Sequence, residues 1–120
     1  MSEPYLEGLK QMVRGLELPK SPEVTLESKH FFSGAALYAN GIICALFSPT
    51  GFAVKLPEDM RVNLLEKGVG AEYRFFADGP VKGEYVALAD SIIQDDEALQ
   101  NLIGASVNYV TGRPGLDEAI

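Results

Sequence analysis

Two residues near the middle of the chain, Asn40 and Gly41, separate two runs of apolar residues. An Asn-Gly pair in this setting is the strongest short-range signal for a β-hairpin, because both central residues of a type I′ turn need a positive φ. A second turn is predicted at 49–51, where a proline presets φ and a glycine accepts a left-handed conformation. The two turns predict three consecutive antiparallel strands, at 24–38, 42–47 and 52–56.

The middle strand of the three is apolar almost throughout, which favours a central and deeply buried position in the sheet. Cys44 lies within it, between Ile43 and Ala45. In such surroundings a cysteine behaves as a small apolar residue, and we expect its thiol to have an ordinary or raised pKa. Gly34 interrupts the first strand and indicates a bulge or the close approach of another backbone.

Three segments have the apolar spacing of helices, at 4–18, 57–67 and 95–111. Two further strands, at 72–77 and 83–88, lie between the second and third helices and should pair as a hairpin. The chain is therefore predicted to be α+β, with two layers, the element order α-β(3)-α-β(2)-α, and an antiparallel sheet covered by helices on one face. The residues expected to face the core are Leu6, Leu9, Val13 and Leu16 in the first helix, Met60, Val62 and Leu65 in the second, and Leu99, Leu102, Ile103, Val107 and Val110 in the third.

The length of 120 residues predicts one domain with its own core, which we place at 1–112. The segment 113–120 follows a Gly-Arg-Pro-Gly run and is expected to be a C-terminal tail. No apolar run approaches the roughly 18–20 residues that span a bilayer. The first residues also lack the basic and apolar regions of a secretory signal. With a single cysteine, these features predict a cytoplasmic protein that does not insert into membranes.

The net charge is −7, and acidic residues dominate the last quarter of the chain. Proteins that bind nucleic acid directly need Lys and Arg side chains to displace phosphate counterions, and no cluster of these residues occurs here. Direct nucleic-acid binding is therefore disfavoured. An acidic surface is better suited to a basic protein partner.

No catalytic or metal-binding motif is found. The sequence has neither of the glycine-rich phosphate-binding patterns, and its only histidine is His30. A zinc site needs several converging ligands, and His30 with Cys44 would supply at most two. The acidic run at 95–97 is explained by the start of a helix, where carboxylates are favourable. We therefore expect a protein that is not an enzyme and that uses no cofactor or metal.

Aromatic residues are the remaining candidates for a functional surface. Several lie on predicted strands, where they either line a pocket or form ordinary core pairs. Two hypotheses stay open. The first is an interaction surface that includes His30, Phe32, Tyr38 and Tyr85. The alternative is a small-ligand-binding or enzymatic pocket around His30, Cys44 and Tyr85, which requires those side chains to converge.

The order of these fragments resembles a known family. The run FFSGAALYANGIICAL at 31–46, followed by GFAVKL at 51–56, is similar to the N-terminal domain of the TfoX/Sxy competence regulators of bacteria. The resemblance continues through YRFF at 73–76, and through the Tyr85 strand to the acidic start of the last helix, and it covers about residues 5–110. The chain departs from the family pattern at Ser33, where the family has glycine, and at Cys44, where it has phenylalanine.

This resemblance implies an α+β fold like that of type III secretion chaperones. It also implies a role in transcriptional control of competence genes, alongside the cyclic-AMP receptor protein. Full-length regulators of the family carry a second, C-terminal domain with helix-hairpin-helix character, and the 120 residues end before such a domain would begin. We therefore expect a stand-alone, non-catalytic module that binds a protein partner such as a transcription regulator. Proteins with secretion-chaperone-like folds often dimerise, so we also expect a homodimer as one form of this chain.

Overall fold

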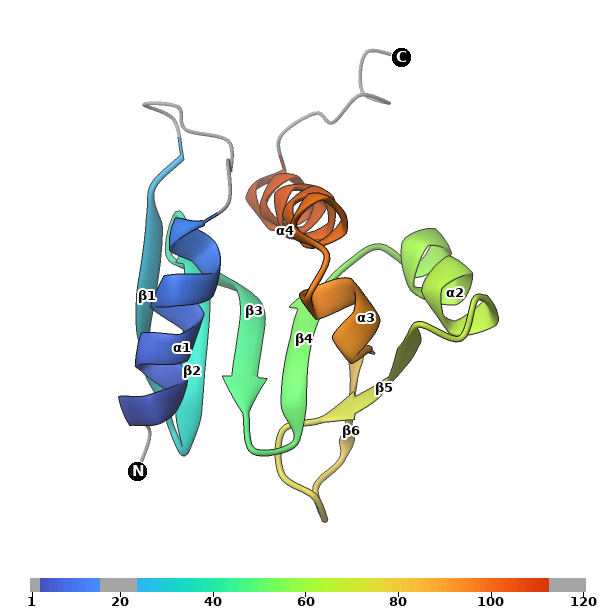
Figure 1. Cartoon of the computed structure of the whole chain (residues 1–120), viewed down its shortest axis with the longest axis horizontal. Coiled ribbons are helices and arrows are strands. Elements are labelled where there is room, and N and C mark those ends of the chain that lie inside the picture. Colours follow the sequence, from blue (N-terminus) through green and yellow to red (C-terminus); the bar gives the residue numbers. More distant parts are fainter. Residues whose placement is uncertain (1–2, 16–23, 113–120) are drawn as a thin grey trace.

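The computed structural model describes residues 3–15 and 24–112, and these residues form one antiparallel sheet with helices on one of its faces (Figure 1). The predicted α+β class is thus confirmed. The predictions for the tail at 113–120 and for Leu16 lie outside the described residues. The helices are α1 (Glu3–Arg14), α2 (Glu58–Glu66), α3 (Asp90–Ile93) and α4 (Asp96–Thr111). The strands are β1 (Leu26–Phe31), β2 (Gly34–Ala39), β3 (Ile42–Ser48), β4 (Gly51–Lys55), β5 (Gly70–Arg74) and β6 (Val81–Leu88), arranged in the order β1-β2-β3-β4-β6-β5.

The predicted turn at Asn40 and Gly41 is confirmed. Both residues have positive φ, 52° and 83°, and the flanking Ala39 and Ile42 pair with each other. Thr25 adds two hydrogen bonds to this turn: its amide donates to Asn40 Oδ1 at 2.8 Å, and its carbonyl accepts from the Asn40 amide at 2.9 Å. The hairpin is therefore fixed by the two turn residues and by the chain that enters β1.

The prediction of one strand over 24–38 was wrong, because the chain reverses direction at Phe32 and Ser33. Phe31 at the end of β1 pairs with Gly34 at the start of β2, so four strands precede α2 instead of three. Phe32 makes this turn with φ of 52°, a value that a bulky residue seldom adopts, and no Asn or Gly marks the position. The predicted close approach at Gly34 is confirmed, since a Cβ there would lie 2.2 Å from the Phe47 carbonyl oxygen.

The prediction for the inward face of α2 was also wrong in part. Val62 and Leu65 are 43% and 44% exposed, whereas Leu64 is buried and Met60 packs beside it on the core. Residues four apart share one face of a helix, so Met60 and Leu64 form the contact stripe. Val62 and Leu65 point away from that stripe.

The third predicted helix corresponds to α4 and is confirmed at both ends. Asp95 caps its N-terminus by accepting from the Ala98 amide at 3.2 Å, and Gly112 ends it with a left-handed φ of 68°. The short helix α3 before it was not predicted. The predicted strand at 72–77 begins and ends earlier, as β5, because the Gly79 amide donates to the Phe76 carbonyl and starts a turn. Its predicted pairing with the next strand is confirmed.

The main core lies between the sheet and the helices. Helix α1 packs on β1, β2 and β3, α4 packs on β2, β3 and β4, and α2 packs on β5 and β6 (Figure 1). Cys44 is completely buried here, and burial raises the pKa of its thiol to about 12. Its carbonyl accepts a hydrogen bond from the Ser106 hydroxyl of α4 at 2.7 Å. No helix among the described residues is long and apolar enough to cross a membrane.

A second apolar cluster lies on the opposite face of the sheet. Successive residues of a strand point to opposite faces, so β2, β3 and β4 each contribute to both clusters. The centre of this cluster is almost fully buried, although no described helix covers that face. The sheet therefore curls around it, and partly buried side chains close its rim. The buried members are Ala36, Leu46, Ala53, Tyr73 and Phe75, and those at the rim include Phe31, Tyr38, Ile43 and Tyr85.

Candidate functional site

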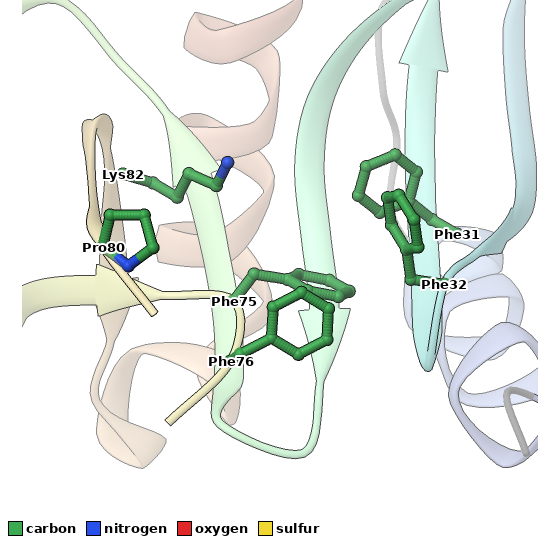
Figure 2. Close-up of a pocket in the computed structure, with 6 residues that line it drawn as sticks. All are labelled: Phe31, Phe32, Phe75, Phe76, Pro80 and Lys82. Atoms are coloured by element: carbon green, nitrogen blue, oxygen red, sulfur yellow. The ribbon is translucent and has the colours of Figure 1, made fainter. Parts of the chain in front are cut away.

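A pocket of about 160 Å³ lies where the two edges of the curled sheet approach each other. One side is formed by the turn between β1 and β2, and the other by the loop that connects β5 with β6 (Figure 2). The pocket therefore joins segments that are more than forty residues apart in the sequence. Its lining consists of Phe31, Phe32, Phe75, Phe76, Pro80 and Lys82.

Four phenylalanine rings form a continuous cluster in this pocket. Phe31 contacts Phe75 with ring centroids 5.3 Å apart and planes at 84°, and Phe32 lies 6.2 Å from Phe76. Within the two Phe-Phe pairs the centroids are 4.8 and 4.9 Å apart. Edge-to-face contacts of this kind contribute about 0.5–1.5 kcal/mol each beyond the burial of their area. The cluster thus fastens the β1 edge of the sheet to the β5 edge.

Two of these rings are exposed to solvent. Phe32 is 74% exposed and Phe76 is 48% exposed, whereas Phe75 is buried. Phe32 also has the left-handed backbone described above. A bulky residue in that region costs of order 1–3 kcal/mol, and such strain is concentrated at functional sites. Because most of the Phe32 ring is exposed, the burial of its remaining surface within the chain offsets little of this strain energy.

The loop that carries Phe75 and Phe76 is held by several hydrogen bonds. The Arg74 guanidinium donates to the Gly79 carbonyl at 2.6 Å and so closes the turn from inside. Thr50, in the turn between β3 and β4, donates its hydroxyl to the Arg74 carbonyl at 2.6 Å. This wall of the pocket is therefore positioned before any ligand arrives.

A buried pair of hydroxyl groups lies behind the same loop. The Ser48 hydroxyl is 2.7 Å from the Tyr73 hydroxyl and 2.9 Å from that of Thr50. Burial raises the pKa of Tyr73, so its hydroxyl stays protonated and remains a hydrogen-bond donor at neutral pH. These contacts join β5, which leads into Phe75 and Phe76, to the end of β3 and the turn that follows it.

Lys82, at the start of β6, is the one cationic side chain among the residues that line the pocket. Figure 2 shows its side chain extending from β6 toward the side on which the phenylalanine rings lie. Among the described residues, the ion pairs are Lys29 with Glu27 and Lys55 with Glu84. The Lys82 ammonium is therefore available to a ligand.

Of the four residues predicted to form an interaction surface, only Phe32 lines the pocket. His30 is exposed on the edge strand β1. Tyr38 and Tyr85 are half-buried on the face opposite the helices, and each ring lies below a lysine ammonium, that of Lys29 at 5.3 Å and that of Lys55 at 5.9 Å. The four residues therefore do not all lie on the same face of the sheet, and they do not form a single site.

The residues of the alternative pocket are not brought together either. Cys44 lies in the core beneath the helices, whereas Tyr85 belongs to the cluster on the other face of the sheet. Burial raises the pKa of Tyr85 to about 12. His30 is exposed on the outer strand, so the three side chains do not line a common cavity. Within residues 3–15 and 24–112, no group of three His, Cys, Asp or Glu side chains is placed to hold a metal ion.

The sequence contains one signal that locates the observed pocket. It has two Phe-Phe pairs, at 31–32 and at 75–76, and each follows or ends a strand. In each pair one ring belongs to the second apolar cluster, Phe31 at its rim and Phe75 in its buried part, while the neighbouring ring is exposed. The two pairs thus mark the two walls of the pocket. Lys82 and Pro80 have no comparable signal.

Comparison with known proteins identifies one family. The family model described as TfoX N-terminal domain matches residues 21–109 of the 120-residue chain. The match includes both walls of the pocket and the whole sheet. A search of curated proteins found no match.

Proposed function

The chain belongs to the TfoX N-terminal domain family, and on that premise we propose that it is a non-catalytic module that binds a protein partner. Through this partner it takes part in transcriptional control of competence genes. The partner is a protein of the transcription machinery, and the chain does not contact nucleic acid itself. We place this activity in the cytoplasm.

The observation that carries the proposal is the exposure of Phe32 and Phe76 beside the pocket. Aromatic residues are enriched at protein interfaces and often supply most of the binding energy. Here the turn that carries Phe32 and the loop that carries Phe76 contact each other through their rings, and hydrogen bonds of Arg74 hold the loop. A partner that covered Phe32 would bury a large ring whose backbone conformation is unfavourable in the free chain.

A second candidate function is the binding of a small apolar ligand. It is favoured by the volume of the pocket, because a cavity of about 150 Å³ lined by apolar side chains holds benzene. The pocket meant here is the phenylalanine pocket, and not the one predicted around His30 and Cys44. The two functions differ in what contacts Phe32, which a cross-linking experiment measures.

The experiment places the photoreactive amino acid benzoylphenylalanine at position 32 of the tagged chain in its host cell. A second chain carries it at position 65, since Leu65 on α2 is also well exposed but lies away from the pocket. We expect a cross-linked protein from position 32 that is absent from position 65. No cross-link from position 32, or the same cross-links from both positions, would contradict the proposed interaction.

The same experiment tests for a homodimer, which stays a prediction. A product in which two copies of the chain are cross-linked has twice the 13.0 kDa mass of one chain, and peptide mapping identifies it. The regulatory role needs its own measurement. Transcripts of competence genes are compared in cells that lack the chain and in cells that express the wild type or Phe32→Asn. We expect the wild type, and not the variant, to restore the transcript levels.

A further inference from the structure

We propose that the phenylalanine pocket binds a peptide segment in which an aromatic residue is next to an acidic residue. Lys82 forms an ion pair with the carboxylate of that acidic residue. The proposal rests on the proposed function, that the chain binds a protein. It specifies which part of the partner the pocket recognises. The ligand is a linear segment of another protein. The test also measures whether a free aromatic acid binds instead.

The size of the pocket limits the occupant to one side chain. Its volume of about 160 Å³ is close to that of an apolar cavity of about 150 Å³ that accommodates a benzene ring. Two rings do not fit. The remainder of the segment must therefore lie outside the pocket, over the exposed rings of Phe32 and Phe76.

The lining selects an aromatic side chain. The neighbouring rings meet at angles between 64° and 87°, so the cluster presents both ring edges and ring faces at its surface. Aromatic rings prefer this edge-to-face geometry when they pack. An incoming ring can continue the pattern against Phe32 and Phe76, whereas an aliphatic chain gains only the burial of its area.

The charge of the rim selects a carboxylate beside that ring. Lys82 forms no ion pair among the described residues, and the exposed Asp78 of the same loop does not pair with it. Arg74, the cation at the end of β5, has its guanidinium hydrogen-bonded to the Gly79 carbonyl. Lys82 is thus the group that an acidic residue of the ligand would meet, and a lysine in the same place would be repelled. Charges at the rim of an interface act mainly on specificity and on the association rate.

The test uses three capped peptides as probes. They have the sequences Gly-Gly-Asp-Phe-Gly-Gly, Gly-Gly-Lys-Phe-Gly-Gly and Gly-Gly-Asp-Ala-Gly-Gly. Each is added up to millimolar concentration to the ¹⁵N-labelled full chain, and amide chemical shifts are followed. We expect the Asp-Phe peptide to shift the amides of residues 31–32 and 75–82, and to bind about three- to five-fold more tightly than the Lys-Phe peptide. The Asp-Ala peptide should cause no shift.

A charge reversal makes the test specific. In Lys82→Glu the order of the first two peptides should reverse, with the Lys-Phe peptide now binding more tightly. The control variant Lys67→Glu changes the same charge at an exposed position outside the pocket, and it should keep the wild-type order. Equal affinity for the two peptides, an unchanged order in Lys82→Glu, or no shift with any peptide would overturn the proposal.

Phenylacetate serves as the probe for a small ligand, because it carries a ring and a carboxylate without a peptide. Tighter binding of phenylacetate than of the Asp-Phe peptide would assign the pocket to small molecules and overturn the peptide assignment. Failure of this inference is distinguishable from failure of the proposed function. If benzoylphenylalanine at position 32 captures a protein while the peptides do not bind as expected, the proposed protein interaction is supported. Only the proposed preference for an aromatic residue next to an acidic residue is then contradicted.

Discussion

Phe31 and Phe75 pack edge to face with their ring centroids 5.3 Å apart. Phe31 ends β1 and Phe75 follows β5, although these two strands form opposite edges of the sheet. Their contact joins the two edges where no strand pairing does. It closes the curled sheet over the second apolar cluster, and it also creates the pocket beside the exposed rings. Stability and the candidate binding site therefore depend on the same side chains.

The first prediction concerns this ring contact. Phe31→Leu and Phe75→Leu each remove one ring and keep an apolar side chain. Because the rings contact each other, the two changes should not be additive, and a double-mutant cycle of chemical denaturation should give a coupling of about 0.5–1.5 kcal/mol. Additivity within about 0.3 kcal/mol would mean that the edges are not joined through these residues.

The second prediction concerns Gly34. A Cβ there would lie 2.2 Å from the Phe47 carbonyl oxygen and 3.0 Å from Ser48 Cα, both backbone atoms that cannot move independently. We expect Gly34→Ala to lower the free energy of unfolding by at least about 1–3 kcal/mol. The matched control is Gly83→Ala in β6, where a Cβ would meet nothing within 4 Å. Equal stability of the two variants would contradict the close approach of β2 and β3.

The third prediction concerns the hydroxyl pair behind the pocket. Tyr73→Phe removes one of the two hydroxyl partners of the buried Ser48 hydroxyl, the one 2.7 Å away, and keeps the ring. The loss of one buried hydrogen bond should cost about 0.5–1.5 kcal/mol. Thermal unfolding is the measurement, with Tyr109→Phe on the exposed side of α4 as the control that should change little. A wild-type melting temperature for Tyr73→Phe would show that this bond does not hold β5.

The fourth prediction concerns alkaline pH. Burial raises the pKa of the Cys44 thiol from 9.0 to about 12 and that of Tyr85 from 10.0 to about 12. The folded chain holds these protons more tightly than the unfolded chain. Their contribution to stability is therefore complete below about pH 8 and is lost as the pH rises from about 9 toward 12. Urea denaturation at about pH 8, 9 and 10 should show a falling free energy of unfolding.

The control for this pH dependence is Cys44→Ala, which removes one of the groups whose pKa burial raises. Its free energy of unfolding should fall less steeply between about pH 8 and 10 than that of the wild type. Reaction of the thiol with a disulfide reagent offers an independent check, because a protonated and buried thiol is inert. Rapid reaction in the folded chain at about pH 8, or the same slope in both proteins, would contradict the burial of Cys44.

Local turn and capping chemistry made several elements predictable from the sequence. Asn40 with Gly41 specifies its hairpin because few other pairs accept two positive φ values. Asp95 and Gly112 specify the two ends of α4 in the same direct way, through a side-chain cap and a left-handed glycine. Features of this kind depend on adjacent residues only, so they can be read without knowing the tertiary structure.

The turn at Phe32 and the face of α2 could not be predicted in this way. Nothing in the chemistry of Phe32 favours a left-handed backbone, and its turn is imposed by the pairing of β1 with β2 and by the contact with Phe75. Likewise, whether Leu64 or Leu65 faces inward is decided by where β5 and β6 lie beneath α2. The pocket shares this dependence on tertiary structure, because its two walls meet only once the sheet has curled.

The central claim, that Phe32 is kept exposed and strained in order to bind a partner, is tested most directly by Phe32→Asn. Asparagine accepts a left-handed φ better than phenylalanine but has no ring. Thermal unfolding and quantitative partner capture are measured on the same preparations, with Leu65→Asn as a control for the loss of an exposed apolar side chain. The account predicts that Phe32→Asn melts near the wild-type temperature, because relief of the backbone strain offsets the loss of the ring contacts with Phe31, Phe75 and Phe76. It also predicts that Phe32→Asn loses the partner, while Leu65→Asn retains it. A variant that melts well below the wild type, or that captures the partner as well as the wild type does, would contradict the claim.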